Sequence, residues 1–197
     1  MVTQQADPAD PLLGFTVGWI ESLAARLERL HLITLEAPRC ALPSNVQSAD
    51  MGKGHGKLRM ALRYWVHLQR ILPQVAVLFC HMVPRYAWLA APLARLHRTP
   101  IVLWYTHRHV GAELRAAHAV SRAVATADLS SFPLESRKVR ALGHGINTNV
   151  FAPDPSILPD SPPLIVQVAR LTAIKHQATL IRAAAQLSTP YQIALIG

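Results

Sequence analysis

The stretches VAVLFC (residues 75–80) and PIVLWYT (residues 100–106) decide the fold of this chain. Both runs are almost continuously apolar, whereas a strand with one solvent-facing side alternates apolar and polar residues. Continuous runs are typical of parallel sheets that are covered on both faces. Between them, residues 86–96 have the periodicity of a helix. The two runs therefore predict a strand–helix–strand unit inside a parallel sheet.

The same alternation continues on both sides of this unit. The upstream residues predict a short strand (2–5), a helix (16–30), a strand (31–36), a loop (41–56) and a second helix (57–72). Downstream, a helical segment (111–118) leads to strands at 123–127 and 138–143. Repeated units of this kind predict an α/β domain with a Rossmann-like, doubly wound parallel sheet.

A proline-rich segment follows this domain. The sequence APDPSILPDSPP, which begins at Ala152, contains five prolines with Ser and Asp between them. We predict an N-terminal domain (1–152), a linker (153–163) and the start of a second Rossmann-like domain (164–197). The last part holds one β-α-β unit, with a strand at 163–170, a helix at 175–187 and a strand at 191–197. Because one such unit cannot bury both faces of its sheet, we expect the second domain to be cut short.

The charge of the chain is concentrated in one segment. The formal net charge is +9, and no Asp or Glu occurs between Asp50 and Glu113. That interval contains nine Lys and Arg residues, whereas the rest of the chain has 11 basic and 11 acidic residues. A local positive field indicates an anionic partner, which could be a nucleic acid, an acidic lipid or a phosphorylated substrate.

The predicted helix at 57–72 carries several of these cations on one side. Arg59, Arg63, His67 and Arg70 are separated by four, four and three residues, which places them on a common face. We expect Arg59, Arg63 and Arg70 to contact an acceptor substrate, such as a lipid phosphate, or an anionic membrane surface. A solvated basic face without a partner explains the same pattern, so both interpretations stay open.

Two positions at predicted strand ends are candidates for binding or catalysis. The turn at Gly14 precedes the first helix, where backbone N–H groups and the helix dipole favour a phosphate, although an ordinary turn explains it as well. His107 follows the strand 100–106, and ligands of open parallel sheets bind outside the carboxyl ends of strands. Its imidazole could bond a sugar hydroxyl or act as an acid or base. His81 has the same position after the strand 75–80, and plain loop histidines remain the alternative for both.

A pair of cations lies after the linker. Arg170 ends the first strand of the last unit, and Lys175 begins its helix, so both flank one short loop. A planar guanidinium and a compact ammonium group at such a loop suit a diphosphate. A solvated loop that happens to contain a lysine is the alternative.

The order of these segments resembles the large retaining glycosyltransferase family often called family 4, which includes glycogen synthase-like and mannosyltransferase-like members. In that family, a phrase like N/H-G-[VI]-D-x-x-x-F precedes the second domain, and a strand ending in G-R-L and a helix opening near P-E-K-G follow. This chain has HGINTNVF at 144–151 and VARLTAIKHQATLIRAAAQL at 168–187. The resemblance extends over nearly the whole chain.

The resemblance implies a GT-B fold and transfer of a sugar, with retention of configuration, from a nucleotide diphosphate sugar to a sugar, polysaccharide or lipid-linked acceptor. Gly14 then matches the glycine-rich loop that faces the donor phosphates, and His107 matches a histidine that contacts the transferred sugar. Arg170 and Lys175 match the pair that neutralises the leaving diphosphate. No metal or other cofactor is expected.

Three departures from the family pattern bear on activity. Asn147 stands where the family usually has Asp, and Ala169 stands where it usually has Gly. The E-x7-E motif, which binds the ribose and sugar of the donor, does not occur in its expected place within these residues. A non-catalytic remnant of such an enzyme is therefore an open alternative.

Other classes have less support. No apolar run reaches the ~20 residues of a membrane-spanning helix, and the N-terminus lacks a basic start and apolar core, so we expect a cytoplasmic protein with peripheral contact to the inner face of the membrane. Cys40 and Cys80 have no metal-binding spacing and are predicted to be buried thiols. The pI near 10.4 raises the alternative of a nucleic-acid-binding protein. The chain has no zinc-finger, helix-turn-helix or RNP-like phrase, so no nucleic acid is expected.

Overall fold

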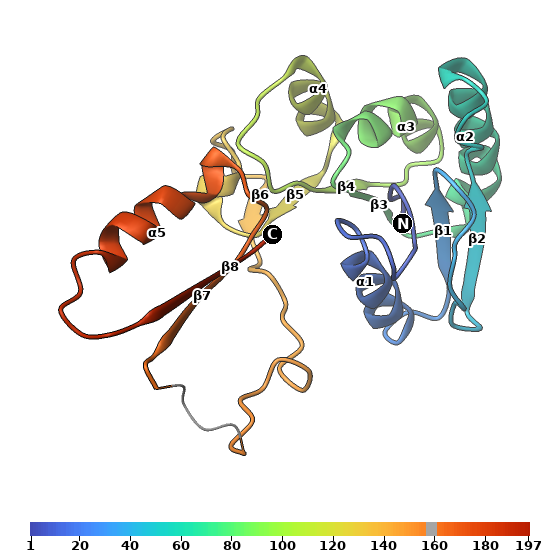
Figure 1. Cartoon of the computed structure of the whole chain (residues 1–197). Helices are drawn as coiled ribbons and strands as arrows, with labels where there is room; N and C mark the ends of the chain where they lie inside the picture. Colours follow the sequence, from blue (N-terminus) through green and yellow to red (C-terminus); the bar gives the residue numbers. More distant parts are fainter. Residues whose placement is uncertain (157–160) are drawn as a thin grey trace. The chain divides into compact units, whose positions relative to one another are not determined.

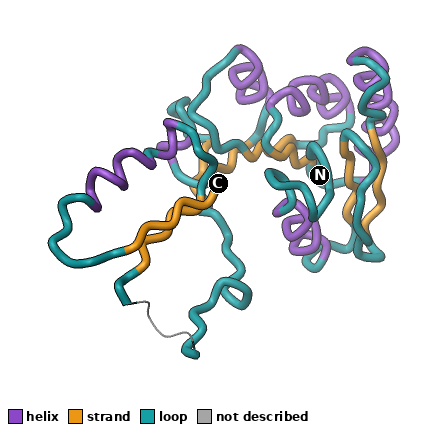
Figure 2. The backbone as a smooth tube through the Cα atoms, in the orientation of Figure 1, coloured by secondary structure: helices purple, strands orange, loops and turns teal. Residues whose placement is uncertain are grey.

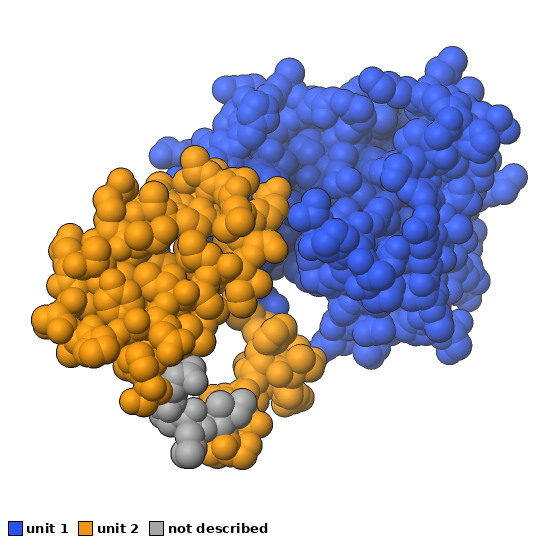
Figure 3. All heavy atoms as spheres, viewed as in Figure 1, with its two compact units in different colours: residues 1–145 blue, residues 146–197 orange. Residues whose placement is uncertain are grey.

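The chain divides into two compact units, residues 1–145 and residues 146–197 (Figure 3). The computed structural model describes residues 1–156 and 161–197. The sequence predicts a first domain that ends at 152 and a linker at 153–163. The division between the compact units comes earlier, at Gly145, and residues 157–160 of the predicted linker lie outside the described residues.

The first unit is built on parallel strands. Two strands pair in the order β2–β1 and four in the order β3–β4–β5–β6, while Val2 joins the groups through parallel bridges to Ile33 and Cys80. The strands are β1 (Leu30–Thr34), β2 (Val46–Asp50), β3 (Leu78–His81), β4 (Ile101–Trp104), β5 (Ala123–Thr126) and β6 (Val139–Ala141). The predicted α/β fold with a Rossmann-like parallel sheet is confirmed.

Helices cover both faces of this sheet. They are α1 (Phe15–Ala24), α2 (Lys57–Ile71), α3 (Pro84–Leu96) and α4 (Ala112–Val120), with short 3-10 turns η1 (Leu72–Gln74) and η2 (Leu129–Ser131). In Figure 1, α1 lies on one side of the strands, and α3 and α4 lie on the other.

Two apolar cores follow from this arrangement. The smaller core packs Ile20 and Ala24 of α1 against Leu30 and Leu32 of β1. The larger core joins Ile33 of the same strand to side chains of α2, α3 and α4. Neighbouring residues of β1 thus enter opposite cores, and all five are buried. This explains why the inner strands read as continuous apolar runs.

Two predictions near the first helix are wrong. The predicted loop 41–56 contains β2, whose mostly polar sequence VQSAD lies at the edge of the sheet and gives no apolar signal. The first helix ends at Ala24 instead of Leu30. Just before β2, the side-chain amide of Asn45 donates to the carbonyl oxygens of Ala24 and Leu27 at 2.9 Å each, and these bonds satisfy groups that a longer helix would use.

Strand boundaries also shift. The predicted strand 2–5 is reduced to the bridges of Val2, with one further backbone bond from Leu35 N to Gln4 O at 2.8 Å. The strand predicted at 75–80 begins only at Leu78. The 3-10 turn η1 ends at Gln74, and Val75 is extended but belongs to no strand. This strand is therefore shorter at its amino end than its apolar run indicates.

The second unit is the predicted β-α-β unit. Its parallel strands β7 (Leu164–Val168) and β8 (Gln192–Ile196) are connected through η3 (Ala173–Lys175) and α5 (Gln177–Ala184), as the colours of Figure 2 show. The helix is shorter than the predicted 175–187, since η3 and the left-handed residue His176 (φ 57°) come before it. Val168, Leu171 and Ile174 are at least 68% exposed. As expected, a single unit leaves much of its apolar surface uncovered.

Candidate functional site

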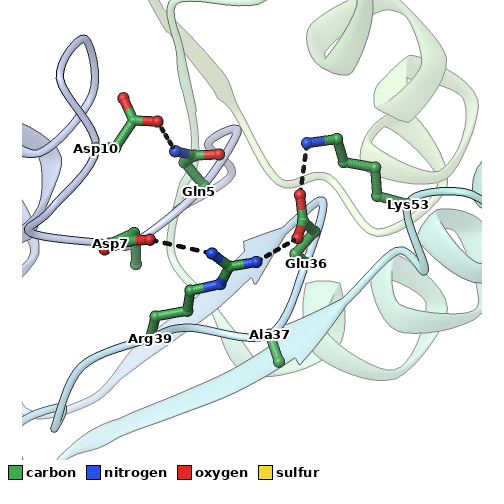
Figure 4. A pocket seen from close by; sticks show the side chains of 8 residues that line it. Gln5, Asp7, Asp10, Glu36, Ala37, Arg39 and Lys53 are labelled. Atoms are coloured by element: carbon green, nitrogen blue, oxygen red, sulfur yellow. Dashed lines mark hydrogen bonds and ion pairs between the residues drawn. The ribbon is translucent and has the colours of Figure 1, made fainter.

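Loops at the carboxyl ends of the strands enclose a polar cavity of about 230 Å³ in the first unit (Figure 4). It lies between the loop after Val2, the loop after β1 and a residue that follows β2. The lining residues are Gln5, Ala6, Asp7, Asp10, Glu36, Ala37, Arg39 and Lys53. Ligands of open parallel sheets bind at this edge, so the cavity is the first candidate site.

A chain of ion pairs crosses the cavity (Figure 4). Arg39 lies 3.5 Å from Asp7 and 3.3 Å from Glu36, and Lys53 Nζ lies 2.5 Å from the second oxygen of Glu36. Lys53 first, and Arg39 to a lesser extent, lower the pKa of Glu36. The cavity therefore holds ionised carboxylate acceptors beside cationic donors, a set that can bond several hydroxyl groups of one ligand.

Asp10 occupies the N–H groups of the first turn. Its Oδ1 accepts from the backbone N–H of Leu13 at 2.6 Å and of Leu12 at 2.8 Å, and its other oxygen accepts from the Gln5 amide. These bonds, the one from Leu13 first, lower the pKa of Asp10. A carboxylate of the chain thus binds two donors of the turn that the sequence predicts to face a phosphate.

Gly14 closes the same loop immediately before α1. A Cβ atom at this position would lie 2.8 Å from the carbonyl oxygens of both Pro8 and Asp10. Glycine is therefore required by the close approach of the backbone to itself, and this packing fixes Asp10 at the cavity. Whether Gly14 also faces the donor phosphates stays a prediction.

His81, at the end of β3, is a buried and neutral histidine. Its Nδ1 lies 3.1 Å from Oγ1 of Thr3, while its Nε2 is buried without a hydrogen-bond partner among residues 1–156 and 161–197. Burial lowers the pKa of His81 to about 4. An unpaired buried polar group of this kind costs about 1–3 kcal/mol of stability.

Aromatic rings surround His81 at the same edge of the sheet. The ring centroids of Trp19 and Phe15, both on α1, lie 5.2 Å and 5.9 Å from that of His81. Trp104, at the end of β4, lies 4.8 Å from Trp19 and 6.1 Å from His144. These rings form an aromatic cluster that packs α1 against the carboxyl ends of β3 and β4.

His107, the predicted catalytic residue, lies in the exposed loop between β4 and α4. Its ring centroid is 5.8 Å from that of Tyr105, whose hydroxyl donates to the carbonyl oxygen of His109 at 3.0 Å. These contacts hold the loop against the end of β4. His107 does not line the polar cavity, and its catalytic role stays a prediction.

Arg170 and Lys175 are exposed on the loop between β7 and α5 of the second unit. The amide of Gln177 donates to the Arg170 carbonyl at 2.9 Å, and that of Gln167 donates to the Lys175 carbonyl at 2.7 Å. The two glutamines thus fix the loop backbone on both sides. Within the described part of the chain, neither cation forms an ion pair.

The three predicted arginines of α2 have different surroundings. Arg59 and Arg70 are exposed, whereas Arg63 lies 3.2 Å from Asp50. Beside the two exposed arginines lie four exposed apolar side chains, Leu58, Leu62, Trp65 and Val66. We call these six residues, Arg59 and Arg70 with the four apolar ones, the α2 surface. It combines an apolar stripe with two cations that no carboxylate of the described residues neutralises.

Residues 1–156 and 161–197 contain neither a candidate metal site nor a membrane-spanning helix. There, no group of three or more His, Cys, Asp or Glu side chains could hold a metal ion. None of the helices in those ranges is long and apolar enough to cross a bilayer. Cys80 is a buried free thiol, as predicted, and burial raises its pKa to about 12, whereas Cys40 is only partly buried.

The sequence did not indicate Thr3, Trp19 or Trp104 as residues of this site. Trp104 could have been found, because it lies near the carboxyl end of the predicted strand 100–106. Thr3 and Trp19 reach the site only through the packing of the first loop and α1 against β3, which no local pattern reveals. No model of a known protein family matches the chain, and no curated protein matches it.

Proposed function

We propose that this chain is part of a retaining glycosyltransferase of the GT-B type, which transfers a sugar from a nucleotide diphosphate sugar to an acceptor. The observation that carries the proposal is the loop between β7 and α5, where Arg170 and Lys175 are exposed on a backbone fixed by two glutamines. The doubly wound first unit and the order of the segments 144–151 and 168–187 support it further.

In this proposal the two cations act on the leaving group. Breaking the bond between sugar and diphosphate builds negative charge on the leaving oxygen, and this charge is larger in the transition state than in the ground state. Cations that are already in place stabilise that charge without reorganisation. Arg170 binds the diphosphate as a planar fork, and Lys175 binds it as a compact charge.

The first unit is proposed to bind the acceptor and the transferred sugar. Asp7 and Glu36 can accept hydrogen bonds from hydroxyl groups of the ligand. Arg39 can donate hydrogen bonds to the oxygen atoms of these hydroxyl groups. The neutral ring of His81 holds the first loop beside the aromatic faces through its contact with Thr3. His107 is proposed to contact the transferred sugar from the loop after β4.

We further propose that the α2 surface contacts an anionic bilayer, which would give access to a lipid-linked acceptor at the cytoplasmic face of a membrane. Leu58 and Leu62 are 75% and 58% exposed. Apolar side chains of an amphipathic helix enter the boundary between headgroups and acyl chains. Arginines beside them pair with lipid phosphates while their stems cover apolar surface.

Calorimetric titration with UDP and GDP tests the nucleotide site. We expect saturable binding of one nucleotide, and an affinity about 10-fold or more lower in Arg170→Ala and in Lys175→Ala, because each removes a charge-assisted contact. Arg182→Ala, an exposed cation on α5, is the matched control and should bind as the unchanged chain does. Equal losses in all three variants, or no binding of either nucleotide, would contradict the proposal.

A further inference from the structure

A second and larger hollow lies at the amino ends of β4, β5 and β6. Its volume is about 800 Å³, and its lining comes from the ends of α3 and α4 and from the residues that lead into these strands. Figure 1 shows α3 and α4 side by side above this part of the sheet. The proposed sugar transfer uses the carboxyl ends of the strands, so it leaves this hollow without a role.

The hollow is strongly basic. Its lining includes Arg95, Arg98, Arg122 and Lys138, and it includes no Asp or Glu. Lys138 Nζ donates to two carbonyl oxygens at the end of α4, at 3.2 Å and 3.3 Å. Over the residues that the structure describes, none of the three arginines takes part in an ion pair.

Helix dipoles account for only part of this charge. Both α3 and α4 end at the hollow, and the carbonyl groups at one helix C-terminus amount to about half a negative charge. Two helix ends therefore balance about one cation, and Lys138 already bonds the carbonyl groups of α4. The charge of three arginines remains without a counterpart in the protein, which favours binding of an anion.

Trp88 and Arg98 are two further features of the hollow. The Nε1 atom of Trp88, a lining residue, is buried and has no hydrogen-bond partner in the described part of the chain. Arg98 has a φ of 55° at the position after α3, where glycine is the usual residue. A contact between the Arg98 side chain and a bound ligand explains why an arginine stands at this strained position.

We propose that this hollow binds a phosphate ester that carries an apolar group. Guanidinium groups bind phosphate oxygens through paired hydrogen bonds. Other lining residues, among them Pro92, Ile101 and Val120, are apolar, and the volume of about 800 Å³ admits a ring or part of an acyl chain beside the phosphate. A soluble ester and a lipid headgroup share this chemistry. The proposal is independent of the glycosyltransferase function.

Nuclear magnetic resonance of the tryptophan indole ¹⁵N–H groups tests it on the full chain, with phenyl phosphate as the probe. The Trp88 signal, identified by its loss in Trp88→Phe, should shift saturably. Arg98→Gly should weaken binding about 10-fold or more, because it removes a charge-assisted contact. Since glycine is favoured at a positive φ, this variant should fold at least as stably as the unchanged chain, so a loss of binding is not a loss of folding.

Matched controls sharpen the test. The double variant Arg26→Gln, Arg29→Gln removes two exposed charges outside the hollow and should leave phenyl phosphate binding unchanged, whereas Arg98→Gly, Arg122→Gln should nearly abolish it. Inorganic phosphate and benzyl alcohol should each bind more weakly than phenyl phosphate. An unmoved Trp88 signal, equal weakening by both double variants, or equal affinity for inorganic phosphate would overturn the proposal.

One further experiment distinguishes a lipid headgroup from a soluble phosphate ester as the ligand. Sedimentation with phosphatidic acid vesicles, against phosphatidylcholine vesicles, measures binding to a lipid headgroup. Dependence of that binding on Arg98 and Arg122 identifies a lipid ligand. Phenyl phosphate binding that needs these arginines, with vesicle binding that does not, identifies a soluble ester. Both outcomes support a site for a phosphate ester. If neither phenyl phosphate binding nor vesicle binding depends on these arginines, the proposal is contradicted.

Discussion

His81 and Thr3 form a buried pair in which Nδ1 of the histidine lies 3.1 Å from Oγ1 of the threonine. The pair connects the end of β3 to the first loop of the chain. Because burial lowers the pKa of His81 to about 4, its ring is neutral at pH 7 and the bond involves no ionised group. A neutral nitrogen is thereby held next to Trp19 at the carboxyl edge of the sheet.

This pair predicts how stability depends on pH. The pKa of His81 is about 4 in the folded state, against 6.5 for the same group when exposed, so between these values the unfolded chain binds the proton more readily. The contribution of the neutral His81 to the free energy of unfolding is complete above pH 6.5 and is lost as the pH falls toward 4. At ~1.4 kcal/mol for each pH unit, the loss amounts to about 3 kcal/mol.

Urea unfolding of the unchanged chain and of His81→Gln, measured from pH 7.5 to pH 4, checks this prediction. The free energy of unfolding of the variant should decline less steeply over that range, since it lacks the titrating group. His107→Gln, which changes an exposed histidine, should follow the curve of the unchanged chain. Parallel curves for the unchanged chain and His81→Gln would refute the lowered pKa of His81 in the folded state.

A pair of glycine substitutions tests the packing of the first loop. Gly14→Ala places a Cβ 2.8 Å from two backbone oxygens, which should lower the free energy of unfolding by about 1–3 kcal/mol. Gly18→Ala, four residues later within α1, meets no atom within 4 Å and should raise it by about 0.5–1 kcal/mol. Chemical denaturation measures both, and a neutral Gly14→Ala would show that the loop can open without cost.

Liposome sedimentation tests the α2 surface. The double variant Arg59→Glu, Arg70→Glu should bind vesicles of phosphatidylglycerol at least about 30-fold more weakly, because each arginine near such a surface contributes about 1 kcal/mol. Arg63 is left unchanged, since a glutamate there would face Asp50 and disturb the fold. The control Arg29→Glu, Arg137→Glu makes the same charge change on other exposed positions. An equal loss in both double variants would indicate attraction by net charge alone.

The fold was largely predictable because the inner strands are covered on both sides. Continuous apolar runs around Leu78 and Leu103 require a parallel sheet, and the helices between them follow from periodicity. The edge strand β2 was missed because a half-exposed strand needs few apolar residues. The end of α1 was misplaced because it depends on Asn45, which comes from a distant loop.

The candidate site was predictable only in part. Strand ends indicated His81 and His107, because the carboxyl edge of a parallel sheet is determined by topology. The ion pairs of Arg39, the burial of His81 and the contact of Arg63 with Asp50 depend on which loops meet in space, and spacing along the chain does not contain that information.

The proposed sugar transfer is tested by measuring the release of UDP or GDP from their sugar conjugates, with a lipid extract as the source of acceptors. We expect release of one nucleoside diphosphate by the unchanged chain, and a rate at least about 100-fold lower in Arg170→Ala, because this variant lacks a group that stabilises the leaving charge. Arg182→Ala should release the nucleotide at the unchanged rate. Bound nucleotide without any release would favour the non-catalytic alternative and contradict the proposed transfer.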